Sequence, residues 1–401
     1  MQDSPWKVSP FNIPPDGLSI PERVYIADCT LRDGEQQAGL VFSREDKLAI
    51  ARALDDLGVD EIEAGTPAVS EEDRAAVEEI AHAGLRAPVS ALARARRDDV
   101  DLVAATGAWG IRLSLPISGI QRMSKLRLSD EAYLARAIEV TEHAKARGLY
   151  VVFSPYDTTR ADPRFLTRVL RELSGRGTVD RFRLVDTVGA ATPHAVRFLT
   201  RLAKDAAEGI PLEVHCHDDF GLAVANTLAG VEAGAAHVSV TVNGIGERAG
   251  NAALEEVALA LHVLYGCPLR LRLSRLPAVS ALVEACSQVP LQPHKAVVGR
   301  NAFAHESGMV VAGLLEDPFT AEPYDPALVG RQREIVLGKK SGAASIRSRL
   351  AVLGWSVPDE AIGPLLSRVK ALSIDARRAV TAEEFKRLVE EVARQPMPGG
   401  A

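Results

Sequence analysis

The chain has 401 residues, 47% of them hydrophobic and 25% charged, a composition typical of a globular enzyme with a large core. Its 47 basic and 53 acidic residues give a net charge of -6, without the basic stripe that nucleic-acid binding requires. The four cysteines are scattered, and no run of about 18 apolar residues or signal-like start occurs. We therefore expect a cytoplasmic protein that binds neither nucleic acid nor membrane, whereas local arginine clusters still allow anionic small molecules.

Short β-branched runs alternate with amphipathic stretches from Val24 onward, after a proline-rich arm. The expected strands are residues 24–28, 59–65, 88–93, 110–116, 150–155, 181–187, 211–217 and 237–244. Helices are expected between them, for example over residues 43–57 and 130–147. Such repeats over roughly 250 residues predict an α/β fold of the TIM (β/α)8 barrel type, with its site at the carboxyl ends of the strands. A doubly wound open sheet is the alternative.

The alternation stops near residue 277, where a stretch punctuated by glycine and proline begins. Two or three amphipathic helices follow it. The expected organisation is an irregular arm over residues 1–22, a barrel over 23–276, a lid or linker over 277–342 and a small helical subdomain over 343–401.

Two histidines share one face of the expected seventh strand. Side chains two residues apart on a strand point the same way, so His215 and His217 can form half of a divalent-metal site. Asp33, in the polar turn after the first strand, can add a carboxylate, and the glycine-rich loop 243–251 can add an amide oxygen. Mg, Mn and Zn all suit such donors. The simpler interpretations are core histidines, a turn aspartate and, for Asn251, a helix N-cap.

Several motifs resemble those of the DRE-TIM metallolyases, in particular their Claisen-condensing branch of 2-isopropylmalate, citramalate and homocitrate synthases. They are DCTLRDGEQQ (28–37), HCHDDFG (215–221), GIGERAGN (244–251), HK (294–295), HESG (305–308) and LGKKSG (337–342). The segments EIEAG (61–65), LSLPIS (113–118) and RADP (160–163) resemble the nitrogenase-type homocitrate synthases most. The resemblance covers nearly the whole chain after the arm.

The resemblance implies the following site. A divalent cation is held by Asp33, His215, His217 and Asn251. A 2-oxo acid chelates this cation, with Arg32 against its reacting oxygen, Thr187 on its carboxylate and Gln36 helping to position it. Acetyl-CoA is the co-substrate, and its methyl carbon attacks the polarised carbonyl before hydrolysis releases CoA. The family also implies a homodimer whose lid crosses between subunits.

The chain departs from the family pattern at the acid and base positions. Tyr156 stands where the family usually has Glu, Val310 replaces a second histidine, and Lys340 replaces another. The family tyrosine of the lid is displaced, with Ala321 in its place and Tyr324 three residues later. Neither Val310 nor Ala321 can transfer a proton.

Two explanations of these departures remain open. Tyr156, His305 and Tyr324 can form a rearranged proton relay, which retains the homocitrate synthase-like acyltransferase activity. Alternatively, the chain keeps the metal and 2-oxo acid site without acyl-CoA condensation, as a carbon–carbon lyase of the aldolase or decarboxylase type. A non-catalytic 2-oxo acid binding protein is a further alternative, although binding alone does not require Arg32.

Substrate size is indicated by cations near the expected barrel mouth. They are Arg94, Arg96, Arg97, Arg122 and Lys125. The phase of the fourth strand also points Arg112 and Ser114 inward. We expect Arg94, Arg112 and Ser114 to bind a second anionic group of the substrate, a carboxylate or a phosphonate. A solvated rim is the simpler interpretation of each cation.

Overall fold

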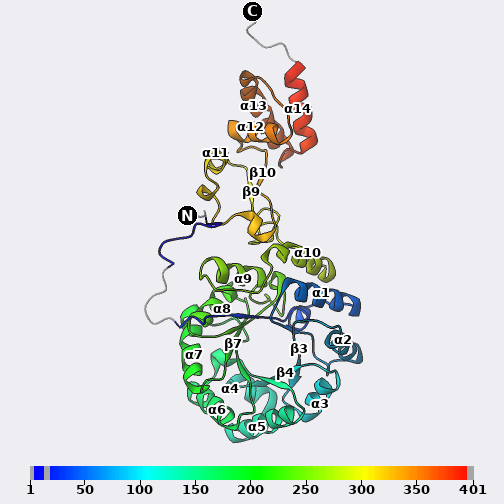
Figure 1. Ribbon diagram of the computed structural model, residues 1–401, viewed down its shortest axis with the longest axis vertical. Helices are drawn as coiled ribbons and strands as arrows, with labels where there is room; N and C mark the ends of the chain where they lie inside the picture. Colours follow the sequence, from blue (N-terminus) through cyan, green and yellow to red (C-terminus); the bar gives the residue numbers. More distant parts are fainter. Residues whose placement is uncertain (1–3, 13–18, 395–401) are drawn as a thin grey trace, which may run out of the picture. The chain divides into compact units, whose positions relative to one another are not determined.

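Eight parallel strands in sequence order form a closed barrel (Figure 1). The computed structural model describes residues 4–12 and 19–394. The strands are β1 (Tyr25–Asp28), β2 (Glu61–Glu63), β3 (Val89–Arg94), β4 (Gly110–Pro116), β5 (Tyr150–Tyr156), β6 (Arg181–Asp186), β7 (Leu212–Cys216) and β8 (His237–Val240). Strand β1 pairs with β8 and closes the barrel, with Tyr25 opposite His237. The predicted TIM barrel is confirmed.

Helices connect the strands and lie outside the barrel (Figure 1). They are α1 (Arg44–Leu57), α2 (Glu71–Ala81), α3 (Arg97–Ala105), α4 (Gly119–Gln121), α5 (Asp130–Ala146), α6 (Pro163–Arg176), α7 (Pro193–Ala206), α8 (Ala223–Glu232) and α9 (Leu254–Val263). A π-helical turn, Arg122–Leu126, follows α4 directly. The two helices predicted over residues 43–57 and 130–147 are confirmed to within one residue.

Local sequence signals explain where several helices begin and end. Ser43 and Asp46 form a capping box at the start of α1, and Gly58 ends this helix with φ of 98°. Asp162 caps α6 ahead of Pro163, and Gly177 ends α6 in the left-handed region. Because these caps satisfy the free backbone groups at the helix ends, they determine the residues at which these helices begin and end.

Two strands are four residues shorter than predicted. The eighth strand was expected to reach residue 244, but β8 ends at Val240 and a 3-10 turn, Val242–Gly244, follows. Asn243 has φ of 61°, which breaks the extended conformation, and its N–H donates to Glu255. Strand β2 covers only Glu61–Glu63 of the expected residues 59–65.

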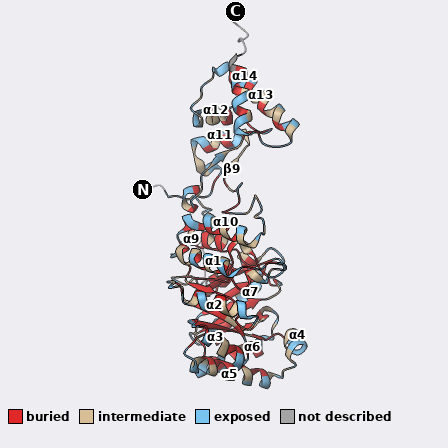
Figure 2. Ribbon diagram, turned by 90° about the vertical axis from the view of Figure 1, so that its right-hand side faces the viewer, coloured by how far each residue is buried: buried red, intermediate tan, exposed pale blue. Residues whose placement is uncertain are grey.

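The barrel strands are buried on both faces (Figure 2). On β4, apolar Ile111 and Leu113 alternate with the fully buried Arg112, and α5 covers the outside of this strand. The interior of a TIM barrel is usually filled by branched apolar residues. Charged side chains inside this barrel therefore need partners there.

The described chain divides into two compact units. One comprises the described part of residues 10–291, and the other combines the described parts of residues 1–9 and 292–401. The boundary lies beyond the expected one at residue 277, because α10 (Leu276–Ser287) packs against α1 of the barrel. The expected arm is likewise divided: Lys7 pairs with Asp317 of the second unit, whereas Ser19 hydrogen bonds to Glu232 in the barrel unit.

The second unit contains a short parallel strand pair and four helices among the described residues. They are β9 (Ala304–His305), β10 (Glu334–Ile335), α11 (Gly308–Glu316), α12 (Ala343–Val352), α13 (Asp359–Ala376) and α14 (Ala382–Arg394). An apolar core that includes Ile346, Leu365, Val369 and Phe385 holds α12 to α14 together. Among the described helices of both units, none combines the length and apolarity needed to cross a membrane.

Candidate metal centre and active-site cavity

Three predicted metal ligands meet at the carboxyl end of the barrel. Asp33 lies in the turn after β1, His215 on β7, and His217 just beyond β7. The two histidine Nε2 atoms are 3.3 Å apart, and they lie 3.4 Å (His215) and 3.9 Å (His217) from Asp33 Oδ2. Ligands around an ion at about 2.1 Å in octahedral geometry are separated by about 3 Å. The spacing of these three donors therefore suits one divalent ion.

Asn251 joins the same group through a backbone bridge with His217. Its Nδ2 donates to Asp33 Oδ1 at 2.8 Å, while its Oδ1 is buried without a hydrogen-bond partner among the described residues. A buried acceptor without a partner is costly, and an ion would satisfy it. Gly246 leaves space for this amide, since a Cβ there would lie 2.0 Å from Asn251 Nδ2. The residues present thus fit a metal ion.

The protonation states of the donors also favour metal binding. Burial lowers the pKa of His215 to about 4 despite the opposing effect of Asp33, so its imidazole is neutral at physiological pH. Its Nδ1 lies 2.9 Å from Ser239 Oγ, which orients the ring with Nε2 toward Asp33. Burial raises the pKa of Asp33, but Arg32 and the two histidines outweigh it and hold that pKa well below its ordinary value.

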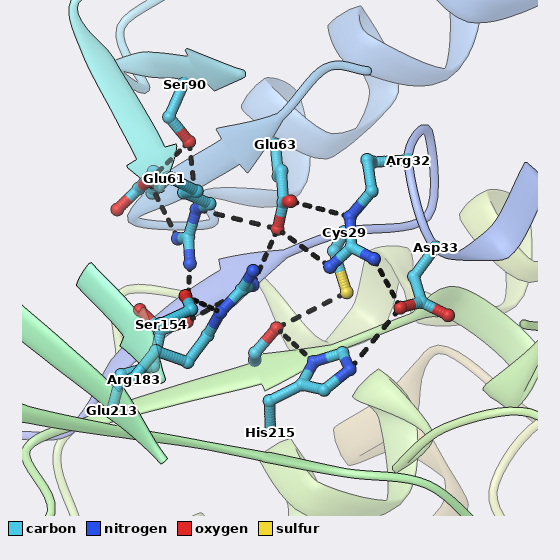
Figure 3. A network of polar contacts seen from close by, with 12 residues as sticks. Cys29, Arg32, Asp33, Glu61, Glu63, Ser90, Ser154, Arg183, Glu213 and His215 are labelled. Atoms are coloured by element: carbon cyan, nitrogen blue, oxygen red, sulfur yellow. Dashed lines mark hydrogen bonds and ion pairs between the residues drawn. The ribbon is translucent and has the colours of Figure 1, made fainter. Parts of the chain in front are cut away.

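Arg32 lies directly against this centre (Figure 3). Its Nη1 donates to Asp33 Oδ2 at 2.5 Å and to Gln36 Oε1 at 2.9 Å, and its Nε donates to Glu63 Oε1 at 2.6 Å. Burial lowers the pKa of Arg32, but Glu63 and Asp33 outweigh it and raise that pKa above its ordinary value. The guanidinium is therefore a permanent, oriented positive charge beside the metal ligands.

A buried network of charges below the centre was missed by sequence reasoning (Figure 3). Its members are Glu61, Glu63, Arg112, Arg181, Arg183 and Glu213. Each lies on the inward face of a strand, and Arg183 reaches up to the cavity. The available signal was charge at alternate positions of otherwise apolar strands, as in the pairs 61 and 63 or 181 and 183.

Arg112 belongs to this network and does not fit the predicted role in substrate binding. It points inward as expected, but its side chain is fully buried, with Nη1 2.5 Å from Glu213 and Nη2 2.7 Å from Glu61. It does not line the cavity. The physical reason is depth: Arg112 lies two residues, or about 7 Å, below Ser114 along β4.

A cavity of about 770 Å³ opens above the centre, within the barrel unit. Arg32, Asp33, His215 and His217 line it, as do the predicted substrate residues Gln36, Arg94, Ser114 and Thr187. Thr187 Oγ1 accepts a hydrogen bond of 2.7 Å from the Asp157 N–H, which leaves the Thr187 hydroxyl proton available to donate into the cavity. Arg94 donates to Asp99 through Nε at 2.7 Å and Nη2 at 3.0 Å.

Tyr156 lines the same cavity at the end of β5. Its hydroxyl lies 3.4 Å from Lys125 Nζ, and burial raises its pKa to about 12. The phenol is therefore protonated at neutral pH and can donate a hydrogen bond or a proton.

The other two predicted acid–base residues lie in the second unit. His305 Nε2 is 3.0 Å from Glu322 Oε1, and Glu322 also accepts from Arg333 at 2.9 Å. Tyr324 packs edge-on against Phe303, and burial raises its pKa to about 12. A histidine held by a carboxylate is a competent proton acceptor.

Known protein families and curated proteins match this chain over most of its length. Residues 23–283 match the HMGL-like family, and residues 297–377 match the homocitrate synthase post-HMGL domain-like family. The chain is 47% identical to homocitrate synthase AksA of Methanopyrus kandleri, which covers 94% of both chains. It is 44% identical to a probable 2-isopropylmalate synthase of Ignicoccus hospitalis, again over 94% of both chains.

The likeness extends to further synthases and to solved folds. A putative (R)-citramalate synthase of Archaeoglobus fulgidus is 43% identical over 92% of this chain and 75% of its own. Hydroxymethylglutaryl-CoA lyase from Pseudomonas aeruginosa shares the fold, with a TM-score of 0.59 and 24% identity over 66% of this chain and 93% of its own. The chain therefore belongs to the HMGL-like family, in the condensing branch that contains homocitrate, 2-isopropylmalate and citramalate synthases.

Proposed function

We propose that this protein is an acyltransferase that condenses acetyl-CoA with an anionic 2-oxo acid, forming a 2-hydroxy di- or tricarboxylate and free CoA. The observation that supports this proposal most strongly is the oriented, permanently charged Arg32 beside a buried Asp–His–His–Asn donor set. Binding a 2-oxo acid does not require such a charge, whereas stabilising a developing oxyanion does. The relatives with 43 to 47% sequence identity are all synthases, which supports this proposal.

The electrophile is prepared by residues at the cavity floor. Asp33, His215, His217 and Asn251 would hold a divalent ion, which would supply Lewis acidity at the 2-oxo group when bound. Arg32 stabilises the negative charge that develops on the carbonyl oxygen, and Gln36 keeps its guanidinium in place. Thr187 donates a hydrogen bond from its hydroxyl to the substrate carboxylate.

Proton transfers accompany the new carbon–carbon bond. A base removes one methyl proton of acetyl-CoA, and the enolate carbon attacks the 2-oxo carbon while the carbonyl electron pair moves to oxygen. That oxygen takes up a proton, and water hydrolyses the thioester to release CoA. In this proposal His305, held by Glu322, is the base, and Tyr156 and Tyr324 donate protons, because both phenols are protonated at neutral pH.

The proposal includes a homodimer in which His305 and Tyr324 act on the cavity of the partner subunit, as the family resemblance implies. A hybrid test addresses this point. The Arg32→Lys and His305→Ala variants are unfolded together and refolded as a mixture, so that hybrid dimers form. We expect the mixture to show more activity than either variant alone. If a verified hybrid dimer stays inactive, the exchange between subunits is contradicted.

The proposal also places the enzyme in the cytoplasm, since all four cysteines are free.

Free thiol release tests the function directly. Purified protein is incubated with Mg²⁺ or Mn²⁺, acetyl-CoA and a panel of 2-oxo acids. We expect thiol release that depends on both the metal and one class of 2-oxo acid. Product formation from the 2-oxo acid without CoA release would instead support the carbon–carbon lyase, and binding without turnover would support the binding protein.

A further inference from the structure

The cavity is richer in cations than the metal centre requires. Seven of its described lining residues are Arg or Lys, and three carry carboxylates. Most of these cations come from the end of β3, the π-helical turn after β4, and α5. The metal donors come from the loops and strands at β1, β7 and β8, so the barrel order places these cations on the opposite side of the mouth.

Five of the seven cations have carboxylate partners. Arg94 is bound to Asp99, Arg96 lies 3.7 Å from Asp98, and Arg97 lies 3.7 Å from Glu139. Arg32 and Arg183 are bound to Glu63, 2.6 and 2.8 Å away respectively. Only Lys125 and Arg136 remain, and neither is within 4.0 Å of a carboxylate among the residues that the structure describes.

The two remaining cations are placed by different elements. Lys125 lies in the π-helical turn Arg122–Leu126, a rare conformation that occurs often at functional sites, and it contacts the hydroxyl and the ring of Tyr156. Arg136 is half-buried on α5. Lys125 is exposed and Arg136 is partly exposed, so water solvates both charges until a ligand fills the cavity and displaces this water. An anionic group on that ligand would then compensate them.

We propose that Lys125 and Arg136 form a second anion-binding subsite, so that the 2-oxo acid substrate carries a second anionic group at its far end. This inference rests on the proposed function only in naming a 2-oxo acid as the ligand. The first carboxylate lies at the metal centre and Thr187, and the second lies across the mouth. A planar carboxylate and a tetrahedral phosphonate both suit one ammonium and one guanidinium. A branched apolar 2-oxo acid would leave both charges without a partner.

Steady-state kinetics of Lys125→Met and Arg136→Gln test the subsite. The probes are 2-oxopentanedioate, 3-phosphonopyruvate and, as monoanionic controls, pyruvate and 3-methyl-2-oxobutanoate. We expect KM for the preferred dianionic probe to rise about 10- to 100-fold in each variant, with monoanionic probes changed by less than about 2-fold. The preferred dianionic probe identifies the second group as carboxylate or phosphonate. Arg164→Gln, an exposed position outside the cavity, is the matched control.

Calorimetry tests the subsite independently of the enzymatic activity. Binding of the same probes to Mn²⁺-loaded protein is measured without acetyl-CoA, so a protein that releases no CoA still reports on Lys125 and Arg136. Unchanged affinity of both variants for dianionic probes would overturn the subsite, even if condensation is observed. A rise in KM confined to acetyl-CoA would also overturn it, because the cations would then bind the CoA phosphates.

Discussion

Arg32 bridges Glu63 and Asp33: its Nε donates to Glu63 at 2.6 Å and its Nη1 to Asp33 at 2.5 Å. One guanidinium thus connects the charge network inside the barrel with the candidate metal centre. Glu63 in turn binds Arg183, which donates to Ser154 on the neighbouring strand β5. Glu63 thus holds the active-site arginine from below, while Asp33 and Gln36 hold it at the level of the metal donors.

Replacing Arg32 by lysine keeps the charge but removes the two-sided geometry. An ammonium group cannot present a planar fork to Glu63 and Asp33. We expect kcat to fall about 100- to 1000-fold, whereas Mn²⁺ affinity measured by calorimetry changes little. Arg44→Lys, on the exposed start of α1, is the control. An unchanged kcat in the Arg32 variant would exclude the proposed role in stabilising the oxyanion.

Gly246→Ala tests Asn251 as a metal ligand without changing any donor. The new Cβ would lie 2.0 Å from Asn251 Nδ2 and 3.0 Å from Asp33 Oδ1, so the amide must move. We expect Mn²⁺ affinity to weaken about 10- to 100-fold. Gly148→Ala also places a side chain at positive φ, but it meets no atom within 4 Å, and it should bind Mn²⁺ normally. Equal affinities in the two variants would remove Asn251 from the ligand set.

Arg112→Met is expected to affect stability and leave substrate preference unchanged. Glu61 and Glu213 would lose a buried cationic partner, which costs about 3 to 5 kcal/mol in free energy of unfolding. Urea unfolding measures this loss. In the comparison variant Arg74→Met, the exposed pair with Glu71 contributes at most about 1 kcal/mol. A changed preference for dianionic substrates in Arg112→Met would restore its predicted binding role.

Acid stability reports on the charge network through Glu63. Burial raises the pKa of this carboxyl, but Arg183 and Arg32 outweigh it and lower that pKa from 4.5 to about 2. A folded-state pKa below the unfolded one stabilises the fold above pH 4.5, and this contribution is lost as pH falls toward 2. Unfolding free energy should therefore fall more steeply with acidification in the parent protein than in Glu63→Gln. The exposed variant Glu71→Gln should follow the parent, and parallel curves for all three would contradict the assignment.

The convergence of the candidate metal ligands was predictable because strand alternation brings His215 and His217 to one face, and barrel topology brings the turn after β1 beside them. The eight strands and the barrel followed from the same periodicity. The buried network was not predictable in this way, because its charges come from strands far apart in the sequence. Only closure of the barrel shows that Arg181 meets Glu61, for example.

The sequence also did not show how deep in the barrel each inward side chain lies along its strand. Alternation placed Arg112 and Ser114 on the same inward face, but it did not show that only Ser114 reaches the cavity. The unit boundary after Leu291 was similarly hidden, since α10 packs against α1 although the regular alternation has ended. Both features depend on packing between distant segments.

The fate of the acetyl methyl carbon shows most directly whether the protein condenses acetyl-CoA with a 2-oxo acid. Protein, Mn²⁺ and the preferred 2-oxo acid are incubated with acetyl-CoA labelled with carbon-13 in the methyl group, and the products are followed by NMR. We expect the label to appear as a methylene carbon bonded to the hydroxyl-bearing carbon of a 2-hydroxy acid. Label found only in acetate or in unreacted acetyl-CoA, while the 2-oxo acid is consumed, would contradict this expectation.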